Sequence, residues 1–144
     1  MIKKHSKIWD ALGNKTRYFV ITGGRGSGKS FEVGRFTNLL SFEEDHKILF
    51  TRQTMTSAHL SIIPEFQEKI DLMQLNNRFD VKKSEIKNLE SGSEIIFRGI
   101  KTSSGDQTAN LKSLQGVTTW VVDEAEELQN ENTFDKINLS VRKK

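Results

Sequence analysis

Residues 23–30 read GGRGSGKS, and the fold that we expect for the chain follows from this stretch. It completes the pattern G-x-x-x-x-G-K-S, with Gly23, Gly28, Lys29 and Ser30 at the fixed positions. Glycines let successive backbone N–H groups turn toward a phosphate, the lysine brings a mobile positive charge, and the serine offers a hydroxyl to Mg²⁺. We therefore predict a nucleotide-binding loop made of Gly23, Gly24, Arg25, Gly26, Ser27, Gly28, Lys29 and Ser30.

The segments on either side of this loop have the patterns that a phosphate-binding loop requires. Tyr18–Thr22 is a short run of apolar β-formers, which predicts a buried strand. After Lys29, apolar residues recur at helical spacing up to Leu40. The first turn of that helix would direct its free N–H groups and the positive end of its dipole at the phosphates.

A second apolar run, Lys47–Arg52, predicts another strand, and a strand, a helix and a strand in this order imply a right-handed unit with a parallel sheet. Thr56 or Ser57 can cap the next helix, whose apolar positions extend to Met73. Pro64 falls inside that pattern. It should either kink the helix or lie in the first turn of a second one.

Residues 79–100 predict an antiparallel hairpin that turns at Ser91-Gly92. Its lysines are either a solvated face or contacts to nucleic acid, and the candidates for phosphate contact are Lys82, Lys83, Lys87, Lys101 and Lys112.

Four further segments are interpreted from their patterns alone. Residues 1–16 have the spacing of a short amphipathic helix, in which Trp9 either packs on the domain or stacks on a base. Residues 101–110 are polar and predict a mobile loop, and residues 111–116 a short helical turn that ends at Gly116. The tail, 130–144, predicts a helix with Thr133 as a candidate cap.

The apolar run Val117–Val122 is followed directly by Asp123 and Glu124. Acidic pairs often only cap helices, but together with a complete phosphate-binding loop this pair predicts a hydrolysis site. Asp123 would hold Mg²⁺ together with Ser30, and Glu124 would orient and deprotonate the attacking water. The catalytic candidates at this stage are Glu124 and Lys29.

Composition sets the limits of the class of protein. The 144 residues are 35% apolar, with no low-complexity tract or linker, so we expect one domain over residues 1–144. Zero Cys excludes disulfides and thiolate metal sites, and three scattered His do not suggest a metal cage, so Mg²⁺ should arrive with the nucleotide.

No apolar run approaches the roughly 20 residues of a membrane span, and the N-terminus lacks a secretory signal, so we expect an intracellular protein. The net charge of +3 permits nucleic-acid contact without arguing for it.

Residues Tyr18 to Arg142 resemble the ATPase part of the large terminase subunit of tailed bacteriophages, especially its PBSX-like branch. The resemblance rests on GGRGSGKS, on SGSEIIFRGI followed by LKSLQGVTTWVVDEAEEL, and on FDKINLSVR. It implies an α/β fold of the P-loop NTPase type, RecA-like and of the additional-strand catalytic-glutamate class. Such a fold has a mainly parallel sheet with flanking helices, here with an added antiparallel hairpin.

The same resemblance implies the function and partners. The family members are ATP-driven motors that move double-stranded viral DNA into a capsid in the host cytoplasm. Their implied partners are a portal, a small terminase subunit and further copies in a ring, with no membrane. Arg25 matches a loop arginine that senses or stabilises the γ-phosphate. A preference for adenine is implied mainly by the resemblance. In agreement with it, the chain has no N-K-x-D motif of the kind expected in a GTPase.

Two departures from the family keep other functions open. A coupling motif and a nuclease domain do not occur within residues 1–144. In addition, the strand that this class of fold places between Tyr18–Thr22 and Val117–Val122 would follow Val117–Val122 in sequence. We therefore expect an incomplete fold with weak hydrolysis, or a rearranged sheet. A non-catalytic nucleotide-binding or assembly module is the alternative, and another ATPase of the same class, such as a helicase or recombinase, is the third hypothesis.

Overall fold

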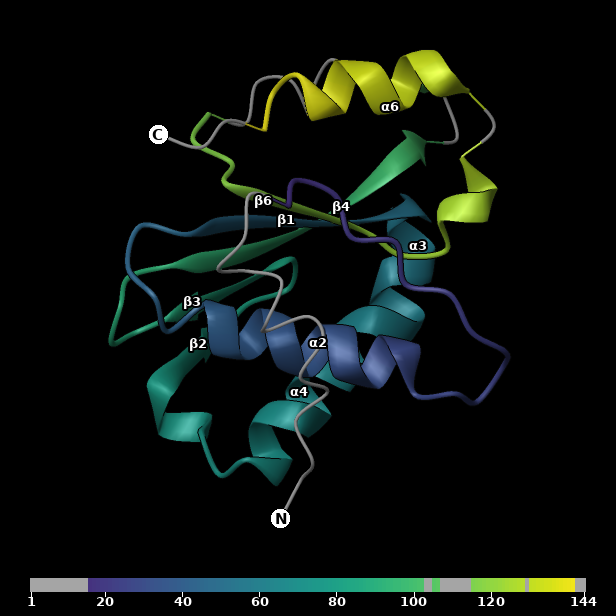
Figure 1. Cartoon of the computed structure of the whole chain (residues 1–144). Coiled ribbons are helices and arrows are strands. Elements are labelled where there is room, and N and C mark those ends of the chain that lie inside the picture. The colour runs from purple at the N-terminus through teal and green to yellow at the C-terminus, as the bar shows by residue number, and fades with distance from the viewer. Residues whose placement is uncertain (1–15, 103–104, 107–114, 129, 142–144) are drawn as a thin grey trace.

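Strand β1 (Lys47–Thr54) lies between two parallel neighbours in a mixed sheet, shown in Figure 1. The computed structural model describes residues 16–102, 105–106, 115–128 and 130–141. Within them the strand order is β2-β3-β4-β1-β6, and the short β5 pairs with β4 outside this path. β1 is parallel to both of its neighbours, β4 (Glu94–Thr102) and β6 (Thr119–Val122). A parallel arrangement is therefore present in β4, β1 and β6, but the predicted parallel unit of Tyr18–Thr22, the helix after the loop and β1 is not formed, because Tyr18–Thr22 is not a strand.

The predicted antiparallel hairpin with its turn at Ser91-Gly92 is present, but its first arm is divided into two strands that pair with each other. β2 (Phe79–Val81) and β3 (Glu85–Asn88) pair antiparallel, and β3 then turns back into β4. Gly92 in that turn has φ 77°, a left-handed conformation that favours glycine. Part of the predicted loop at 101–110 is strand instead: β4 runs on to Thr102, and β5 (Gly105–Asp106) pairs with it antiparallel. The ladder of β4 extends further than the polar composition suggested.

Helices cover both faces of the sheet (Figure 1). One face carries α2 (Lys29–Leu40) and α4 (Ile63–Leu72), and the other carries α6 (Glu131–Asn138). Successive residues of β1 point to opposite faces. Accordingly, Ile48 and Phe50 belong to the core cluster under α2 and α4, whereas Leu49 belongs to the cluster with Ile137 of α6.

The connection after β1 is built around Pro64. α3 (Met55–Ser57), a π-helical turn η1 (Ala58–Ile62) and α4 follow one another without a break. A proline ring clashes with the carbonyl four residues before it, and the wide π turn lies at that place. Pro64 is the second residue of α4, as one of the two sequence hypotheses expected. The cap is Thr54 rather than Thr56 or Ser57, since its hydroxyl accepts from the backbone N–H of Ser57 at 3.2 Å.

The remaining elements are short. η2 (Asn76–Arg78) leads into β2, and η3 (Ala125–Glu127) follows β6. The tail helix is capped by Asn130, whose side chain accepts from Asn132 N at 2.9 Å, and not by Thr133. Expectations about residues 1–15, 107–114 and 142–144, including Trp9 and Lys112, lie outside the described residues. In the described ranges, no helix combines the length and apolar character needed to cross a bilayer.

The prediction of a buried strand at Tyr18–Thr22 is wrong. This segment has no strand assignment, and its apolar residues are exposed, with Val20 at 87%. A strand requires a partner for its backbone N–H and C=O groups. Among the described residues β6 pairs with β1 alone, so no ladder reaches Tyr18–Thr22.

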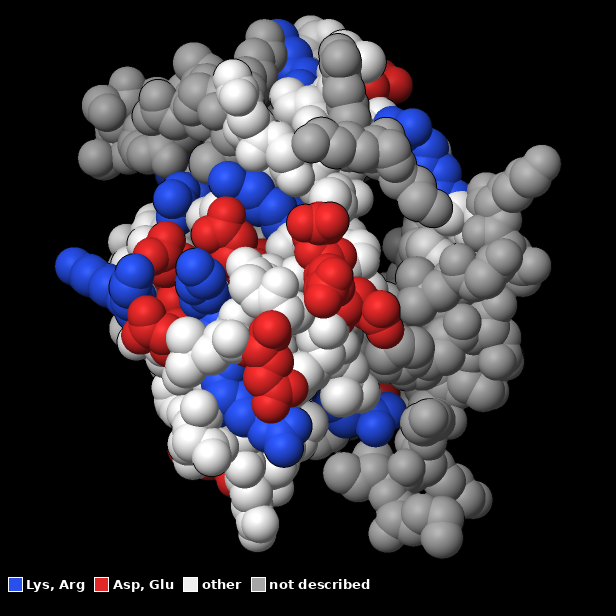
Figure 2. Space-filling view, turned by 90° about the vertical axis from the view of Figure 1, so that its left-hand side faces the viewer, with Lys and Arg blue, Asp and Glu red and all other residues white. Residues whose placement is uncertain are grey.

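Charged side chains at the end of the sheet where β1 begins are paired across strands. In register, Asp80 faces Lys87, Lys87 faces Glu94, and Glu94 faces Lys47 at an ion-pair distance of 3.1 Å. Lys82 in turn contacts Glu85 at 3.0 Å. Figure 2, which looks at this side of the molecule, shows acidic and basic side chains interleaved. The pairing favours the solvated-face interpretation of Lys82 and Lys87 over nucleic-acid contact.

Gly99 of β4 lies against the backbone at Thr54 and Met55, where β1 ends and α3 begins. A Cβ added at Gly99 would lie 2.3 Å from the backbone N of Met55, which cannot move without disturbing the helix start. We expect Gly99→Ala to lower the free energy of unfolding by about 2 kcal/mol or more, measured by urea denaturation. Gly24→Ala is the matched control, because an added Cβ there meets nothing within 4 Å. Equal stability of the two variants would contradict the crowding at Gly99.

Candidate nucleotide-binding site

The predicted phosphate-binding loop leads directly into α2. Gly28 is the N-cap of the helix with φ 80°, and Gly26 has φ 75°, so glycine is favoured at both positions. Glu32 N donates to Gly28 O at 2.9 Å and closes the first helical turn. The N–H groups of that turn point out of the helix start, toward the loop. Ser30 is exposed, and so is Arg25.

Lys29 bonds to its own loop. Its Nζ donates to Gly23 O and, at 3.1 Å, to Gly24 O. The loop is tightly folded, because a Cβ added at Gly23 would lie 2.8 Å from Ser27 Oγ. In this conformation the ammonium of Lys29 donates to two carbonyl oxygens of its own loop. The oxygens of a bound anion could accept these hydrogen bonds instead. Binding of a phosphate would therefore exchange these two hydrogen bonds to neutral carbonyl groups for bonds to negatively charged phosphate oxygens.

Asp123 and Glu124 follow the carboxyl end of β6. Asp123 N donates to Thr51 O at 3.0 Å, which ties the residue to the end of β1. Burial raises the pKa of the Asp123 carboxyl above its usual value, and the nearby Arg52 guanidinium opposes the shift. Glu124 has φ 53°, a left-handed conformation that is uncommon for a residue with a side chain. The chain therefore turns sharply here, and both acids lie at the same sheet edge.

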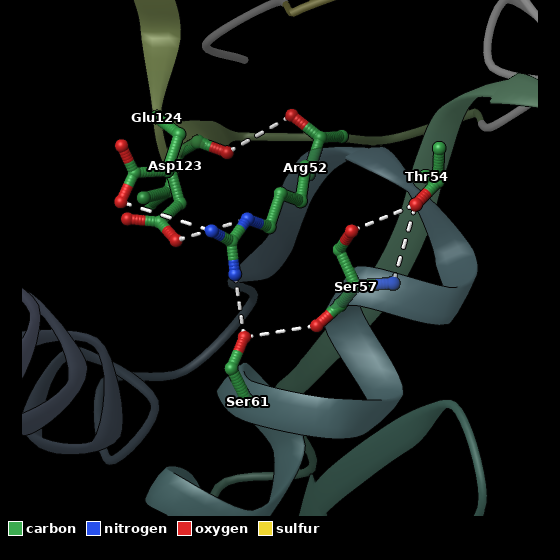
Figure 3. Close-up of polar contacts among 8 residues, drawn as sticks. Arg52, Thr54, Ser57, Ser61, Asp123 and Glu124 are labelled. Carbon is green, nitrogen blue, oxygen red and sulfur yellow. Dashed lines mark hydrogen bonds and ion pairs between the residues drawn. The ribbon is translucent and has the colours of Figure 1, made fainter. Parts of the chain in front are cut away.

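Arg52 of β1 is a site residue that the sequence interpretation missed. Its Nε lies 3.9 Å from Asp123 Oδ2 and its Nη2 3.7 Å from Glu124 Oε1, so it faces both acids (Figure 3). The parallel register places Thr51 beside Val122, and the next residues along are therefore Arg52 and Asp123. A basic residue at the end of the second apolar run, KILFTR, was the signal that could have identified it.

A chain of hydroxyl groups continues from Arg52 into the following helix. Arg52 Nη1 donates to Ser61 Oγ at 2.5 Å, and Ser61 Oγ donates to Ser57 O at 2.9 Å (Figure 3). The Thr54 and Ser57 hydroxyls lie 2.8 Å apart. The π-helical turn and the two acids are thus joined through one guanidinium group.

The acids after Asp123 also interact with one another. A hydrogen bond to Glu126 raises the pKa of Glu124, with burial adding to the shift. The pKa of Glu126 is lowered, chiefly by its own backbone N–H and by the same bond to Glu124, and the positive charge of Lys29 contributes. Lys29 of the loop is therefore within electrostatic reach of the acidic turn. Within the described part of the chain, no hydrogen bond or ion pair joins Gly23–Ser30 to Asp123 or Glu124.

The donor groups at the two halves of the site fit Mg²⁺. A hydroxyl at Ser30 and a carboxylate at Asp123 are the oxygen ligands that this ion prefers, usually with waters and phosphate oxygens completing its shell. No group of three or more His, Asp or Glu in the described residues could hold a metal ion by itself. Ser30 and Asp123 are thus too few to bind the ion without a nucleotide.

Comparison with known proteins gives two findings. A sequence model of the family described as phage terminase large subunit matches residues 15–144. The chain is also 28% identical over 129 residues to the terminase large subunit of Bacillus phage SPP1, an alignment that covers 85% of this chain and 29% of that relative. The chain therefore spans less than a third of the length of this relative.

The contact between Arg52 and Asp123 can be tested by titration. Substitution Arg52→Gln removes the positive charge that opposes the effect of burial, so we expect the pKa of Asp123 to rise further, as followed by carbon-detected NMR of its carboxyl group. Ser61→Ala is the control, since it removes a neutral partner of Arg52 and leaves the charge in place. A pKa of Asp123 that does not change in Arg52→Gln would show that the guanidinium does not act on this carboxyl.

Proposed function

The chain belongs to the phage terminase large subunit family, and we propose that it forms the ATP-binding and ATP-hydrolysing part of such a subunit, which powers the packaging of viral DNA. The observation that supports this proposal is the pair of half-sites: a glycine-rich loop that opens α2, and two acids at the carboxyl end of β6 within electrostatic reach of Lys29. The fold of this proposal is the RecA-like P-loop class, with which the mixed α/β sheet is compatible.

The proposed mechanism assigns a role to each residue. The N–H groups of Gly23–Gly28 and the first turn of α2 bind the phosphates, and Lys29 leaves the carbonyls of Gly23 and Gly24 to donate to them. Ser30 and Asp123 hold Mg²⁺, which neutralises charge on the phosphate oxygens. Arg25, which is exposed on the loop, contacts the γ-phosphate.

Glu124 acts as the general base in this proposal. It orients the attacking water and accepts its proton, so its carboxyl group has to be ionised when water attacks. The hydrogen bond to Glu126 and burial disfavour the ionised state of Glu124, whereas Arg52, 3.7 Å away, favours it. Arg52 therefore helps to keep Glu124 ready to accept a proton.

The proposed partners follow from the family. They are double-stranded viral DNA, a portal, a small terminase subunit and further copies in a ring, in the cytoplasm of the host. An arginine from a neighbouring copy can be worth about 10³ to 10⁵ in the rate of phosphoryl transfer. The isolated chain should accordingly hydrolyse ATP slowly.

A second function is favoured by one observation. Tyr18–Ile21, directly before the loop, is exposed and pairs with no strand in the described ranges. A loop that is not fixed to the sheet can bind a nucleotide without placing it accurately for hydrolysis. The second candidate is therefore a nucleotide-binding or assembly module without turnover. ATP and Mg²⁺ that raise the thermal stability, with no phosphate release even when DNA is present, would favour it over the motor.

The first test concerns binding. We expect Lys29→Met to weaken the affinity for ATP by about a hundredfold, because a hydrogen bond from a charged group contributes about 1.5–3 kcal/mol and each 1.4 kcal/mol is tenfold. Isothermal titration calorimetry measures this affinity. Lys83→Met is the control, since Lys83 is an exposed lysine between β2 and β3. Equal affinity of wild type and Lys29→Met would reject the loop as the phosphate site.

The second test concerns hydrolysis. We expect Glu124→Gln to bind ATP as tightly as the wild type but to release phosphate about 10² to 10⁴ times more slowly, because the amide cannot accept the proton from water. Phosphate release and nucleotide affinity are measured on the same preparations. Glu127→Gln, three residues along in the same turn, is the control. Turnover that is equal in the wild type and in Glu124→Gln would mean that the base is another residue.

A further inference from the structure

Lys69 of α4 is a buried lysine whose ammonium lies beside the first turn of α2. The residue is 3% exposed, and Nζ lies 4.9 Å from the centroid of the Phe31 ring. Nζ donates to Glu65 O at 3.2 Å and lies 3.6 Å from Glu65 Oε2. Lysine is almost never this buried without a paired group. Glu65, one turn earlier on α4, is that group here, but a pair within one helix does not account for the contact of the ammonium with Phe31 of α2.

Helix α2 has a gap that the stem of Lys69 fills. Gly34 lies inside the helix and is buried, although glycine there costs about 1 kcal/mol relative to alanine. A Cβ on Gly34 would lie 3.1 Å from Lys69 Cε and 3.2 Å from Lys69 Cδ. Because Gly34 has no side chain, the stem of Lys69 fits against α2 there and brings Nζ to the Phe31 ring. Gly34 of α2 and Lys69 of α4 thus fit together and determine the place of the ammonium.

That place is electrostatically unfavourable in the absence of an anion. Phe31 is the third residue of α2, so the ammonium lies beside the helix end that carries a partial positive charge. A cation near a helix N-terminus is normally destabilising. Glu65 offsets part of this charge, but its side chain is 45% exposed, and solvent weakens its effect. An anion bound at the start of α2 would interact favourably with both the helix end and Lys69.

We propose that Lys69 is a positioning residue for the phosphates of the bound nucleotide. It holds the first turn of α2 against α4 and adds positive potential behind the phosphate-binding loop. The inference rests on the proposed nucleotide site. The contact between Lys69 and Phe31 matters for the position of the loop, because Tyr18–Thr22, which precedes the loop, is not a strand of the sheet in the described part of the chain.

The test compares three proteins with two nucleotides. In Lys69→Met the stem still fills the gap beside Gly34 but the charge is lost, and Lys69→Arg keeps the charge. We expect Lys69→Met to weaken binding of Mg²⁺-ATP about threefold to thirtyfold and of Mg²⁺-ADP less, because the lost attraction scales with the charge of the ligand. Lys69→Arg should restore most of the affinity. Thermal unfolding without nucleotide should be unchanged or shifted upward in Lys69→Met, since an apolar residue replaces a buried charge.

Each alternative outcome decides between explanations. Equal affinity of the wild type and Lys69→Met for both nucleotides would overturn the inference and leave the proposed function intact. An equal loss for ATP and ADP together with a lower unfolding temperature would also overturn it, because that is the result of a packing role. Failure of the wild type itself to bind either nucleotide would overturn the proposed function and the inference with it.

Discussion

The parallel register between β1 and β6 is the constraint on which the candidate site depends. Because Thr51 lies beside Val122, the residues that follow are also neighbours: Arg52, which is still in β1, and Asp123, which directly follows β6. The N–H of Asp123 still bonds to Thr51 O, so the last ladder bond belongs to the site itself. A slip of one residue would turn each side chain of β6 to the opposite face and separate the guanidinium from both carboxyl groups. Backbone hydrogen bonds thus determine the electrostatics of the acidic turn.

Local patterns in the sequence predicted what depends on local chemistry. The loop glycines, the start of α2, the turn at Gly92 and the break at Pro64 are each determined by one residue type and its immediate neighbours. The apolar run before Asp123 likewise predicted β6. The roles of the site residues remain predictions. The end of KILFTR could have drawn attention to Arg52 as a basic residue, but its partners and those of Lys69 could not be identified in this way, because they lie about 70 and 35 positions away in sequence and only the fold brings them together.

The wrong prediction at Tyr18–Thr22 has a physical origin of the same kind. Four consecutive apolar residues have the composition of a strand buried on both faces, but composition does not supply the hydrogen-bonding neighbour that a strand needs. Phe31 and Leu139 are also exposed, so the apolar surface is not confined to this segment. Exposing large side chains at 40% to 87% costs hydrophobic free energy of about 25 cal/mol per Å² of apolar surface. A contact that covered these side chains would therefore stabilise the fold.

The two ends of the sheet differ in how charge is balanced, and the difference explains why the proposed site lies where it does. Where β1 begins, Asp80, Lys87, Glu94 and Lys47 alternate in sign across four strands, so little net field remains. Where β1 ends, Arg52 directly faces Asp123 and Glu124, with Glu126 close by. A nucleotide adds further negative charge to that end, which a divalent cation between the phosphates and Asp123 would offset. Lys29 and Lys69, on the loop side, would draw the phosphates toward α2 and away from the acids. The two lysines would then hold the phosphates at the start of α2, the cation would reduce their repulsion from the acids, and Glu124 would be free to accept a proton from water.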